Sequence, residues 1–348
     1  MPIDRLYMIG EIGQNHNGSV EIAKLLTEIA ARPVVDHLFQ KTLKGFDAVK
    51  LTKRDLKQEL SATKMREPYD SLHAFGKTYG EHREFLELTD EEHLEAYKHA
   101  KAHGLDFVET LCAVGCLSML KLFSPDYLKV ASRDLTNLPL LTALAETKIP
   151  IILSTGMAGQ PELDNALDVV SKYHSEISIL HCVSEYPTQY NHVNLNTISY
   201  LKARYPQYTI GYSDHTIGIA IPVAAVAMGA RIIEKHITID RKLKGTDQAG
   251  SLGIEGMERM MRDIRNLEVA FGKEGIFVEK TVESARVKLE RSIASLRLIE
   301  EGQVITEADL HLLSPGNGFK WSELNLVVGK KAKTSIPANE IIYAELIT

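Results

Sequence analysis

"IGYSDHTIGIAIPVAAVAMGARIIEKHIT", residues 210–238, is the stretch that decides the fold. Two β-type runs frame a helical run of small apolar residues, and Met-Gly-Ala at 228–230 places a glycine where helices commonly end. A polar cluster closes each β-type run: Ser213-Asp214-His215 and Glu234-Lys235-His236. A strand, a helix and a second strand, each strand ending in polar residues, predict one repeat of a larger parallel α/β fold.

The same alternation of apolar β-type runs with amphipathic helical runs continues along most of the chain. We predict strands at 6–11, 47–52, 106–110, 127–132, 150–155, 177–183, 209–214 and 231–236. Eight strands that are each followed by a helix favour a (β/α)8 TIM barrel. A doubly wound open sheet is the alternative, but no glycine-rich phosphate-binding fingerprint follows the first strand.

Two regions depart from this repeat. Segment 56–95 is polar and is longer than an ordinary strand-to-helix connection, which is typical of a functional or disordered loop. After about residue 283 the sequence changes to short strand-like runs separated by turns. That change predicts a separate, small β-rich module at the end of the chain.

The composition is that of an ordinary globular protein. The chain has 348 residues, 44% hydrophobic and 25% charged, which is enough to bury a sizeable core. A net charge of -6, from mixed acids and bases, lacks the basic stripe that nucleic-acid binding requires. No apolar run approaches the about 20 residues that span a bilayer, and residues at the N-terminus lack the charged-then-apolar pattern expected of a secretion leader. Three cysteines, an odd number, indicate a reducing compartment, so we expect a cytoplasmic protein with no nucleic-acid or membrane partner.

Polar residues gather where the predicted strands end, which is where TIM barrels place their active sites. Period-two alternation puts Ser213 and His215 on one face of their strand, and Glu234 and His236 on one face of the next. If both faces point inward, the two histidines can bind one ion, and two imidazoles with added oxygens suit Mn²⁺, Fe²⁺ or Zn²⁺ better than Mg²⁺. The alternative is that each histidine is a hydrogen-bonded core residue. A matched pair at adjacent strand ends favours the metal site.

Other strand ends carry groups that suit an anion. Lys129 supplies a positive charge, and Ser132, Ser154 and Ser213 supply short hydroxyl donors. The alternative is that the serines cap the helices after their strands, although a helix N-terminus also binds phosphate.

At this point the residues resemble the sialic acid synthases over nearly the whole chain and in the same order. The motifs are "EIGQNHNG" (11–18), "AFGKTYGEHRE" (74–84), "KVAS" (129–132), "STGM" (154–157), "LHCVSEYP" (180–187), "GYSDHTIG" (211–218), "EKHITID" (234–240) and "GTDQAGSL" (245–252). The run "SIASLRLIEEGQVIT…SPGNGF…LVVGKKA" (292–332) is similar to the antifreeze-like (SAF) domain of that family. The resemblance implies a barrel domain at 1–271, a linker at 272–291 and a SAF domain at 292–348.

The resemblance also implies an activity. Sialic acid synthases condense phosphoenolpyruvate with an N-acylated hexosamine, typically N-acetylmannosamine, to give a nine-carbon keto acid and phosphate. They act as domain-swapped homodimers with a divalent metal, most commonly Mn²⁺, with Mg²⁺ or Co²⁺ as options, which here implies His215 and His236 as ligands. By resemblance, the substrate-binding residues are Lys50, Thr110, Lys129, Ser132, Ser154, Ser184, Tyr186, Ser213 and Asp247. Asp134 and Glu11 are the candidates for proton transfer or for positioning water.

Several positions depart from the family pattern, and they fall where the sugar is expected. They are Thr52, the run Leu111-Cys112-Ala113, Arg133-Asp134, Asp247-Gln248 and Ser314. A 2,4-diacylated hexose, as in legionaminic- or pseudaminic-type synthesis, is therefore an alternative acceptor. A metal-dependent aldolase or hydrolase and a non-catalytic carbohydrate-binding barrel are the further alternatives.

Overall fold

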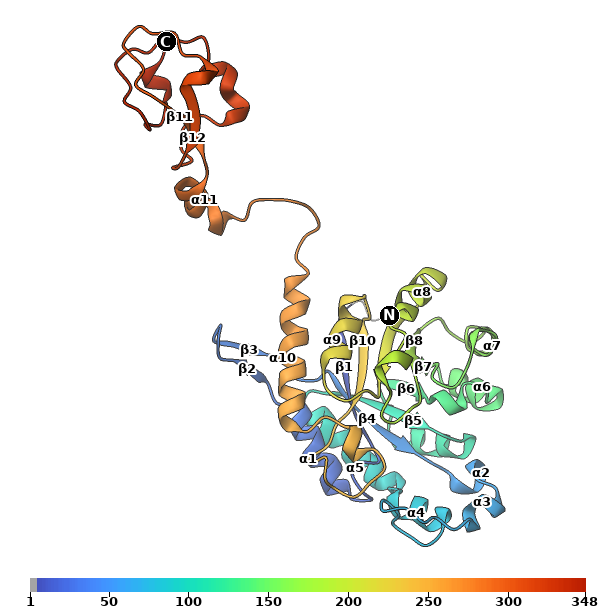
Figure 1. Cartoon of the computed structure of the whole chain (residues 1–348). Coiled ribbons are helices and arrows are strands. Elements are labelled where there is room, and N and C mark those ends of the chain that lie inside the picture. The colour runs from blue at the N-terminus through green and yellow to red at the C-terminus, as the bar shows by residue number, and fades with distance from the viewer. Residues whose placement is uncertain (1–4) are drawn as a thin grey trace. The chain divides into compact units, whose positions relative to one another are not determined.

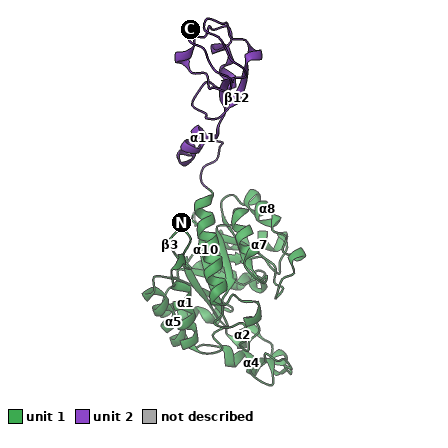
Figure 2. Cartoon of the chain, turned by 60° about the vertical axis from the view of Figure 1, so that its left-hand side comes forward, with its two compact units in different colours: residues 1–271 green, residues 272–348 purple. Residues whose placement is uncertain are grey.

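The computed structural model describes residues 5–348. It divides the chain into two compact units, residues 1–271 and residues 272–348 (Figure 2). Each unit has its own hydrophobic core, so each is described by itself.

The first unit is built on a closed barrel of eight parallel strands (Figure 1). Around the barrel the order is β1-β10-β9-β8-β7-β6-β5-β4, and β1 pairs with both β10 and β4, which closes the sheet. The predicted TIM barrel and all eight predicted strands are confirmed, and the doubly wound open sheet is wrong. The strands are β1 (Tyr7–Gly13), β4 (Ala48–Lys53), β5 (Asp106–Leu111), β6 (Tyr127–Val130), β7 (Ile151–Ser154), β8 (Ile177–Cys182), β9 (Thr209–Asp214) and β10 (Ile232–His236).

Helices surround the barrel because the outer strand faces are apolar and must be covered. In α1 the side chains of Ala23, Leu26 and Ile29 are buried, at the spacing that places residues on one helix face. Helices α1 (Val20–Ala31), α5 (Asp90–Ala102), α6 (Leu138–Glu146), α7 (Gln160–Val170), α8 (Asn196–Arg204), α9 (Ala220–Ala227) and α10 (Ile254–Ala270) follow strands, as do 3₁₀ helices at Val114–Lys121, Ser132–Asp134, Tyr190–His192 and Gln248–Gly250.

Both faces of the strands are buried. On β1, Tyr7 and Ile9 belong to the cluster inside the barrel, whereas Met8 and Ile12 belong to the core beneath the helices. The interior cluster is small: Tyr7, Ile9, Ala48, Val108, Ile152, Leu180 and Ile232. Because apolar side chains fill the barrel interior, the polar strand ends above it form a floor and not a channel.

Two features of the first unit were not predicted from the sequence. A short hairpin joins α1 to β4 and consists of β2 (Val34–Asp36) and β3 (Lys41–Leu43). Segment 56–95 contains three helices that were not predicted, α2 (Leu56–Glu59), α3 (Ala62–Arg66) and α4 (Tyr79–Leu86), and then the start of α5, whose helical pattern the sequence does show. Capping boxes begin the last two helices, with Thr78 and Thr89 as caps, and their S/T-x-x-E pattern is the sequence signal that marks such starts.

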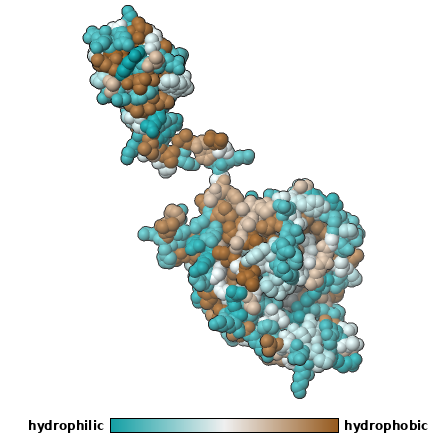
Figure 3. All heavy atoms as spheres, viewed as in Figure 1, coloured by the Kyte–Doolittle hydropathy of each residue, from teal (hydrophilic) through white to brown (hydrophobic). Residues whose placement is uncertain are grey.

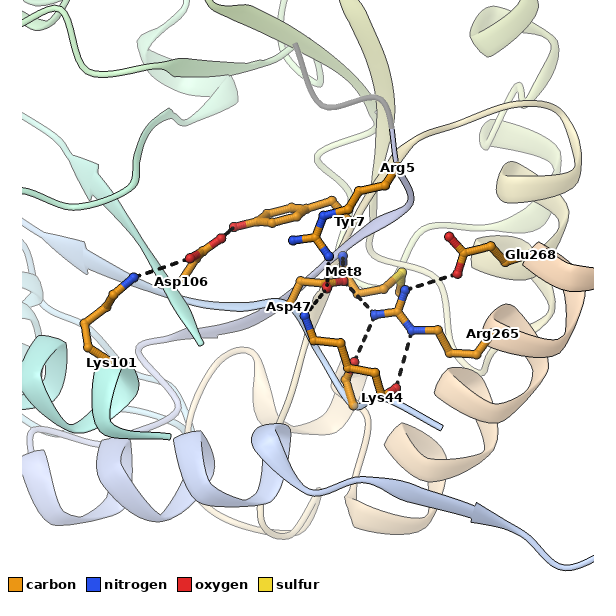
Figure 4. Close-up of polar contacts among 10 residues, drawn as sticks. Arg5, Tyr7, Met8, Lys44, Asp47, Lys101, Asp106, Arg265 and Glu268 are labelled. Carbon is orange, nitrogen blue, oxygen red and sulfur yellow. Dashed lines mark hydrogen bonds and ion pairs between the residues drawn. The ribbon is translucent and has the colours of Figure 1, made fainter. Parts of the chain in front are cut away.

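The amino-terminal end of the barrel strands carries a dense network of ion pairs (Figure 4). Asp47, just before β4, has a fully buried carboxylate that accepts hydrogen bonds from Arg5 (3.0 Å), Lys44 (2.7 Å) and Arg265 (2.6 Å). The backbone N–H of Met8 donates to the same carboxylate at 2.9 Å. This network ties β1 and β4 to α10.

The second unit is small and β-rich. It contains β11 (Ser292–Ser295) and β12 (Leu310–Leu313), which pair antiparallel, and a core that includes Ile293, Ile299 and Val327. Helix α11 precedes the strands, and 3₁₀ helices complete the unit: α11 is Glu283–Leu289, and the 3₁₀ helices are Lys280–Val282, Glu307–Asp309, Trp321–Leu326 and Ala344–Leu346.

Segment 276–289 exposes apolar side chains (Figure 3). Those of Ile276, Phe277, Val278, Val287 and Leu289 are all at least half exposed. Among the residues described, no helix has both the length and the apolar character needed to cross a membrane.

Candidate active site

A polar cavity of about 140 Å³ lies at the carboxyl ends of the barrel strands. All eight strands contribute to its wall, because each ends at the same rim. Their contributions are Glu11 from β1, Lys50 from β4, Thr110 from β5, Lys129 from β6, Ser154 from β7, Cys182 from β8, Ser213 from β9, and Glu234 and His236 from β10.

Strand alternation decides which side chains reach the cavity. On β5, Thr110 lines the cavity, whereas the neighbouring Glu109 points to α5, where its carboxylate lies 3.0 Å from His93 Nδ1. Register then brings distant residues together, because Glu11 is the strand partner of both Lys50 and His236.

Lys50 is the centre of the charge network in the cavity. Its buried Nζ lies 2.8 Å from Glu11 and 3.7 Å from Glu234, and it donates to Thr110 Oγ1 at 3.2 Å. Burial alone would lower the pKa of Lys50, but the two carboxylates outweigh it and the pKa is raised. Lys50 therefore carries its charge at neutral pH.

The charge of Lys129 is less well balanced by carboxylates than that of Lys50. It donates to Ser154 Oγ at 2.6 Å and to the Val130 carbonyl at 3.0 Å, and its nearest carboxylate oxygen, on Glu234, is 4.0 Å away. Burial lowers the pKa of Lys129. A buried ammonium of this kind gains when an anion is placed beside it.

The two carboxylates on the floor have different environments. Burial raises the pKa of Glu11, against the effect of Lys50. For Glu234 burial also acts to raise the pKa, but Lys129 and Lys50 outweigh it and the pKa is lowered. Glu234 further accepts a hydrogen bond from Ser213 Oγ at 2.9 Å. The protonated form of Glu11 is thus favoured relative to an ordinary glutamic acid, whereas the charged form of Glu234 is favoured.

His215 and His236 lie side by side at this rim, with ring centroids 5.7 Å apart. His215 Nδ1 lies 2.8 Å from the Val183 carbonyl, which accepts only from a protonated nitrogen and so leaves the lone pair on Nε2. His236 Nδ1 is buried without a hydrogen-bond partner, and burial lowers the pKa of His236. The residues fit a divalent cation, because two imidazole rings lie together and His236 Nδ1 has no partner.

A buried ion pair holds the two histidine-bearing strands together from behind. Lys235 on β10 is about 1% exposed and pairs with Asp214 on β9, and it also donates to the Thr216 carbonyl. These residues immediately precede the histidines and point to the opposite strand face. The spacing of the histidines is therefore fixed by protein contacts.

The sequence matches two family models. The NeuB family matches residues 40–275 and the SAF domain matches residues 290–348. The chain belongs to the NeuB family.

Similarity to known proteins covers nearly the full length of this chain. N-acetylneuraminate-9-phosphate synthase of Homo sapiens is 31% identical over 98% of this chain and 92% of its own length. N,N'-diacetyllegionaminic acid synthase of Campylobacter jejuni is 34% identical over 96% of this chain and 98% of its own. The crystal structure of N-acetylneuraminic acid synthetase from Leptospira borgpetersenii superposes with a TM-score of 0.67 at 30% identity, covering 81% of this chain and 90% of that one.

Most of the site residues predicted from the sequence line this one cavity of the NeuB-type barrel. They are Glu11, Lys50, Thr110, Lys129, Ser132, Ser154, Tyr186, Ser213, His215, His236 and Asp247. Ser184 lines an adjoining cavity instead. Asp134 lines neither: it is buried and accepts a hydrogen bond from Arg133 Nε at 3.3 Å. Its predicted role in proton transfer stays a prediction.

Sequence reasoning did not assign Gln14, Arg54 or Glu234 to the site, although all three line the cavity. Glu234 was detectable, because it shares a strand face with His236. Gln14 and Arg54 follow the ends of β1 and β4, where no periodicity indicates direction.

A second set of groups that could hold a cation lies on the helices of the NeuB-type barrel. Glu28 of α1 and His99 of α5 already contact each other at 3.2 Å, and exposed His103 lies beside them. This set does not line the cavity.

Proposed function

We propose that this member of the NeuB family condenses phosphoenolpyruvate with an N-acylated hexosamine, N-acetylmannosamine in the first instance. The product is a nine-carbon 2-keto-3-deoxy sugar acid, and inorganic phosphate is released. The observation that supports this most is the juxtaposition of the His215–His236 pair with two buried lysines in one cavity.

In this proposal phosphoenolpyruvate binds on the cavity floor. Lys50 and Lys129 supply charge for its carboxylate and phosphate, and short hydroxyls supply directed hydrogen bonds. The hydroxyls are those of Thr110, Ser132, Ser154 and Ser213, with Ser184 at the edge.

The acceptor aldehyde binds at the histidine pair. A divalent cation on His215 and His236, Mn²⁺ in our proposal, supplies Lewis acidity at the aldehyde carbonyl. The Tyr186 ring lies 4.0 Å from the His215 ring, centroid to centroid, and Asp247 lines the same wall. Tyr186 thus offers the sugar a flat face, and Asp247 offers its hydroxyls an acceptor.

The bond changes balance with one added water. C3 of phosphoenolpyruvate forms a bond to the aldehyde carbon, and the aldehyde oxygen takes up a proton. Water adds at C2, and the C2–O bond to phosphate then breaks, which leaves the ketone and inorganic phosphate. Glu11 is our candidate for the proton at the aldehyde oxygen, because it lines the cavity and burial raises its pKa.

The test is an assay of phosphate release with phosphoenolpyruvate, an aldose and Mn²⁺, with mass spectrometry of the product. We expect release only when all three are present, and loss after chelation. No release from any acceptor in a panel of N-acylated hexosamines and 2,4-diacetamido hexoses would contradict the proposal. A carbohydrate-binding protein without activity would differ in thermal unfolding, because sugar alone would stabilise it and phosphoenolpyruvate with metal would not.

The panel also addresses the acceptor. The curated relatives include both an N-acetylneuraminate-9-phosphate synthase and an N,N'-diacetyllegionaminic acid synthase. A product with two acylated nitrogens would assign this chain to legionaminic- or pseudaminic-type synthesis.

For assembly we propose a cytoplasmic homodimer in which residues 292–348 form the SAF domain, joined through the linker 272–291. The exposed apolar side chains of segment 276–289 support it, because an apolar surface of this kind is usually covered by a partner. Light scattering at micromolar concentration should give the mass of a dimer, and a monomer would contradict the proposal.

A further inference from the structure

Helices α1 and α5 lie side by side on the outside of the barrel and are joined by a row of side-chain contacts (Figure 1). Lys24 of α1 lies 2.7 Å from Glu95 of α5. Four residues further along each helix, Glu28 Oε1 lies 3.2 Å from His99 Nε2. Side chains four residues apart share one helix face, so the two contacts follow one another along the same interface.

His103 extends this row at the end of α5. It comes four residues after His99, and the two rings lie 4.4 Å apart, centroid to centroid. His103 Nδ1 lies 2.9 Å from the His99 carbonyl, which accepts only from a protonated nitrogen, so the lone pair of the neutral ring is on Nε2. Metal-binding histidines are commonly held in this way, with the second ring nitrogen donating to a backbone carbonyl.

The three side chains are close enough to share one ion. One ligand atom each from Glu28, His99 and His103 lie within 4.8 Å of one another. Two atoms that bind the same Zn²⁺ at about 2.0–2.1 Å are at most about 4.2 Å apart. Because His103 is exposed and the other two are only partly buried, small side-chain movements bring all three ligands into range.

The neighbouring lysines do not compete for this position. Lys24 is held by Glu95, and Lys101 of α5 lies 2.9 Å from Asp126. Within residues 5–348, no lysine or arginine nitrogen lies within 4.0 Å of Glu28, whose ion-pair partner is His99. The carboxylate is therefore available to a cation.

The position of the cluster also favours a cation. Helix α1 ends at Ala31 and α5 ends at Ala102, so the cluster lies at the carboxyl ends of both helices, where the helix dipole is negative. His103 precedes the first residue of β5, Asp106, by three residues. The cluster thus lies towards the amino-terminal rim of the barrel, the rim that serves stability in this fold.

We propose that Glu28, His99 and His103 bind one Zn²⁺ ion, which links α1 to α5. This inference goes beyond the proposed function, because none of the three residues lines the cavity. Two imidazoles and one carboxylate suit Zn²⁺ better than Mn²⁺ or Mg²⁺, and water completes the coordination. The ion stabilises the folded barrel and takes no part in the reaction.

The experiment uses the full chain without a polyhistidine tag and Zn²⁺ alone as the probe. Calorimetric titration gives the number of ions bound per chain and their affinity, for the wild type and His103→Ala. Because the cavity histidines can bind the same ion, both forms are also measured in a His236→Ala background. We expect His103→Ala to weaken one ion by at least about 100-fold in either background, since loss of even an outer-shell partner costs about 10- to 100-fold.

Two further variants sharpen the result. Glu28→Gln keeps the size of the side chain and removes its charge, so it should weaken the same ion. The matched control is His192→Ala, because His192 also pairs with a glutamate, Glu185, at 2.9 Å, but belongs to no cluster of three potential ligands among residues 5–348. It should bind Zn²⁺ as the wild type does.

Thermal unfolding gives a second readout. In the His236→Ala background, Zn²⁺ should raise the unfolding temperature, and His103→Ala should abolish that rise. Without Zn²⁺ the two proteins should unfold at the same temperature, because the His103 side chain is exposed.

Two outcomes would overturn the inference: Zn²⁺ binding that His103→Ala leaves unchanged in both backgrounds, or an equal loss in His192→Ala. Neither measurement involves turnover, so the proposed function would stand. If His103→Ala abolishes binding and His236→Ala does not change the ion count, the inference is supported and the proposed metal in the cavity is contradicted instead.

Discussion

At the amino-terminal end of the barrel, Asp47 is buried with every carboxylate oxygen paired to a cation or a backbone N–H. At the carboxyl end, Lys129 has no carboxylate closer than 4.0 Å, and Gln14 Nε2 and His236 Nδ1 have no partner at all. Both rims carry buried polar or charged side chains. They differ in whether the protein itself completes the interactions.

The difference teaches how to separate stability from function in this fold. A satisfied network contributes to folding, whereas groups left without partners cost folding free energy and gain it back only when a ligand binds. Substitutions at the two rims should therefore have opposite signatures in stability and activity.

The largest effect is expected at the histidine pair that we propose binds the metal, His215 and His236. His236→Ala should lower kcat/KM by at least about 1000-fold, because a Lewis acid contributes several kcal/mol to a transition state. The assay is phosphoenolpyruvate-dependent phosphate release at saturating Mn²⁺, with the unfolding temperature as control. If the variant keeps activity within ten-fold of the wild type, the proposal that His236 binds the metal is contradicted.

Asp47→Asn tests the opposite rim. It should lower the free energy of unfolding by about 3 kcal/mol, because it leaves Arg265 without its buried partner. Urea denaturation measures this, and kcat/KM below the transition should be unchanged. The matched control, Asp263→Asn, alters a half-exposed pair with Arg262 and should cost less than about 0.5 kcal/mol. If both variants lose the same free energy of unfolding, the buried Asp47 network stabilises the fold no more than an exposed ion pair does.

Lys129→Met sharpens the contrast in the cavity. We expect kcat/KM for phosphoenolpyruvate to fall by about 100-fold, the worth of a charge-assisted hydrogen bond. The unfolding temperature should stay constant or rise, because burial already disfavours the charged form of Lys129. A variant that loses stability together with activity would show Lys129 to be a structural residue.

The smallest effect is a pH dependence at Asp47. Burial acts to raise its pKa, but Arg265 and Lys44 outweigh it, so the pKa in the folded state lies below the ordinary value of 3.8. The stabilisation is thus complete above about pH 4 and is lost as the pH falls below that value, since the unfolded state then binds more protons. The difference in unfolding temperature between wild type and Asp47→Asn should shrink from pH 7 to pH 3. A constant difference would contradict it.

The barrel and the position of the histidines could be predicted from the sequence because both follow from local period-two patterns. Ser213, Glu234 and His236 alternate on strands, and parallel strands bring their carboxyl ends to one rim. Motif resemblance added residues such as Asp247, which lies in a loop where no periodicity applies.

Residues on the connections could not be predicted in this way. Arg83 lines the adjoining cavity because segment 56–95 folds into short helices, and their positions depend on tertiary contacts such as that with Gln14. The β2–β3 hairpin was missed because three-residue strands carry too few positions to display a period. Asp134 does not line the cavity, whereas its neighbour Arg133 does, and its predicted role in proton transfer stays a prediction.

The pairing of β1 with β10 sets when this catalyst can exist during its synthesis. Glu11 lies beside His236, so the first and last strands of the barrel are neighbours and end at the same rim. A nascent chain on the ribosome contains Lys50 and Lys129, which we propose bind phosphoenolpyruvate, long before residue 236 has been translated. The cavity is therefore complete only after β10 has been translated, and a shorter product lacks His236.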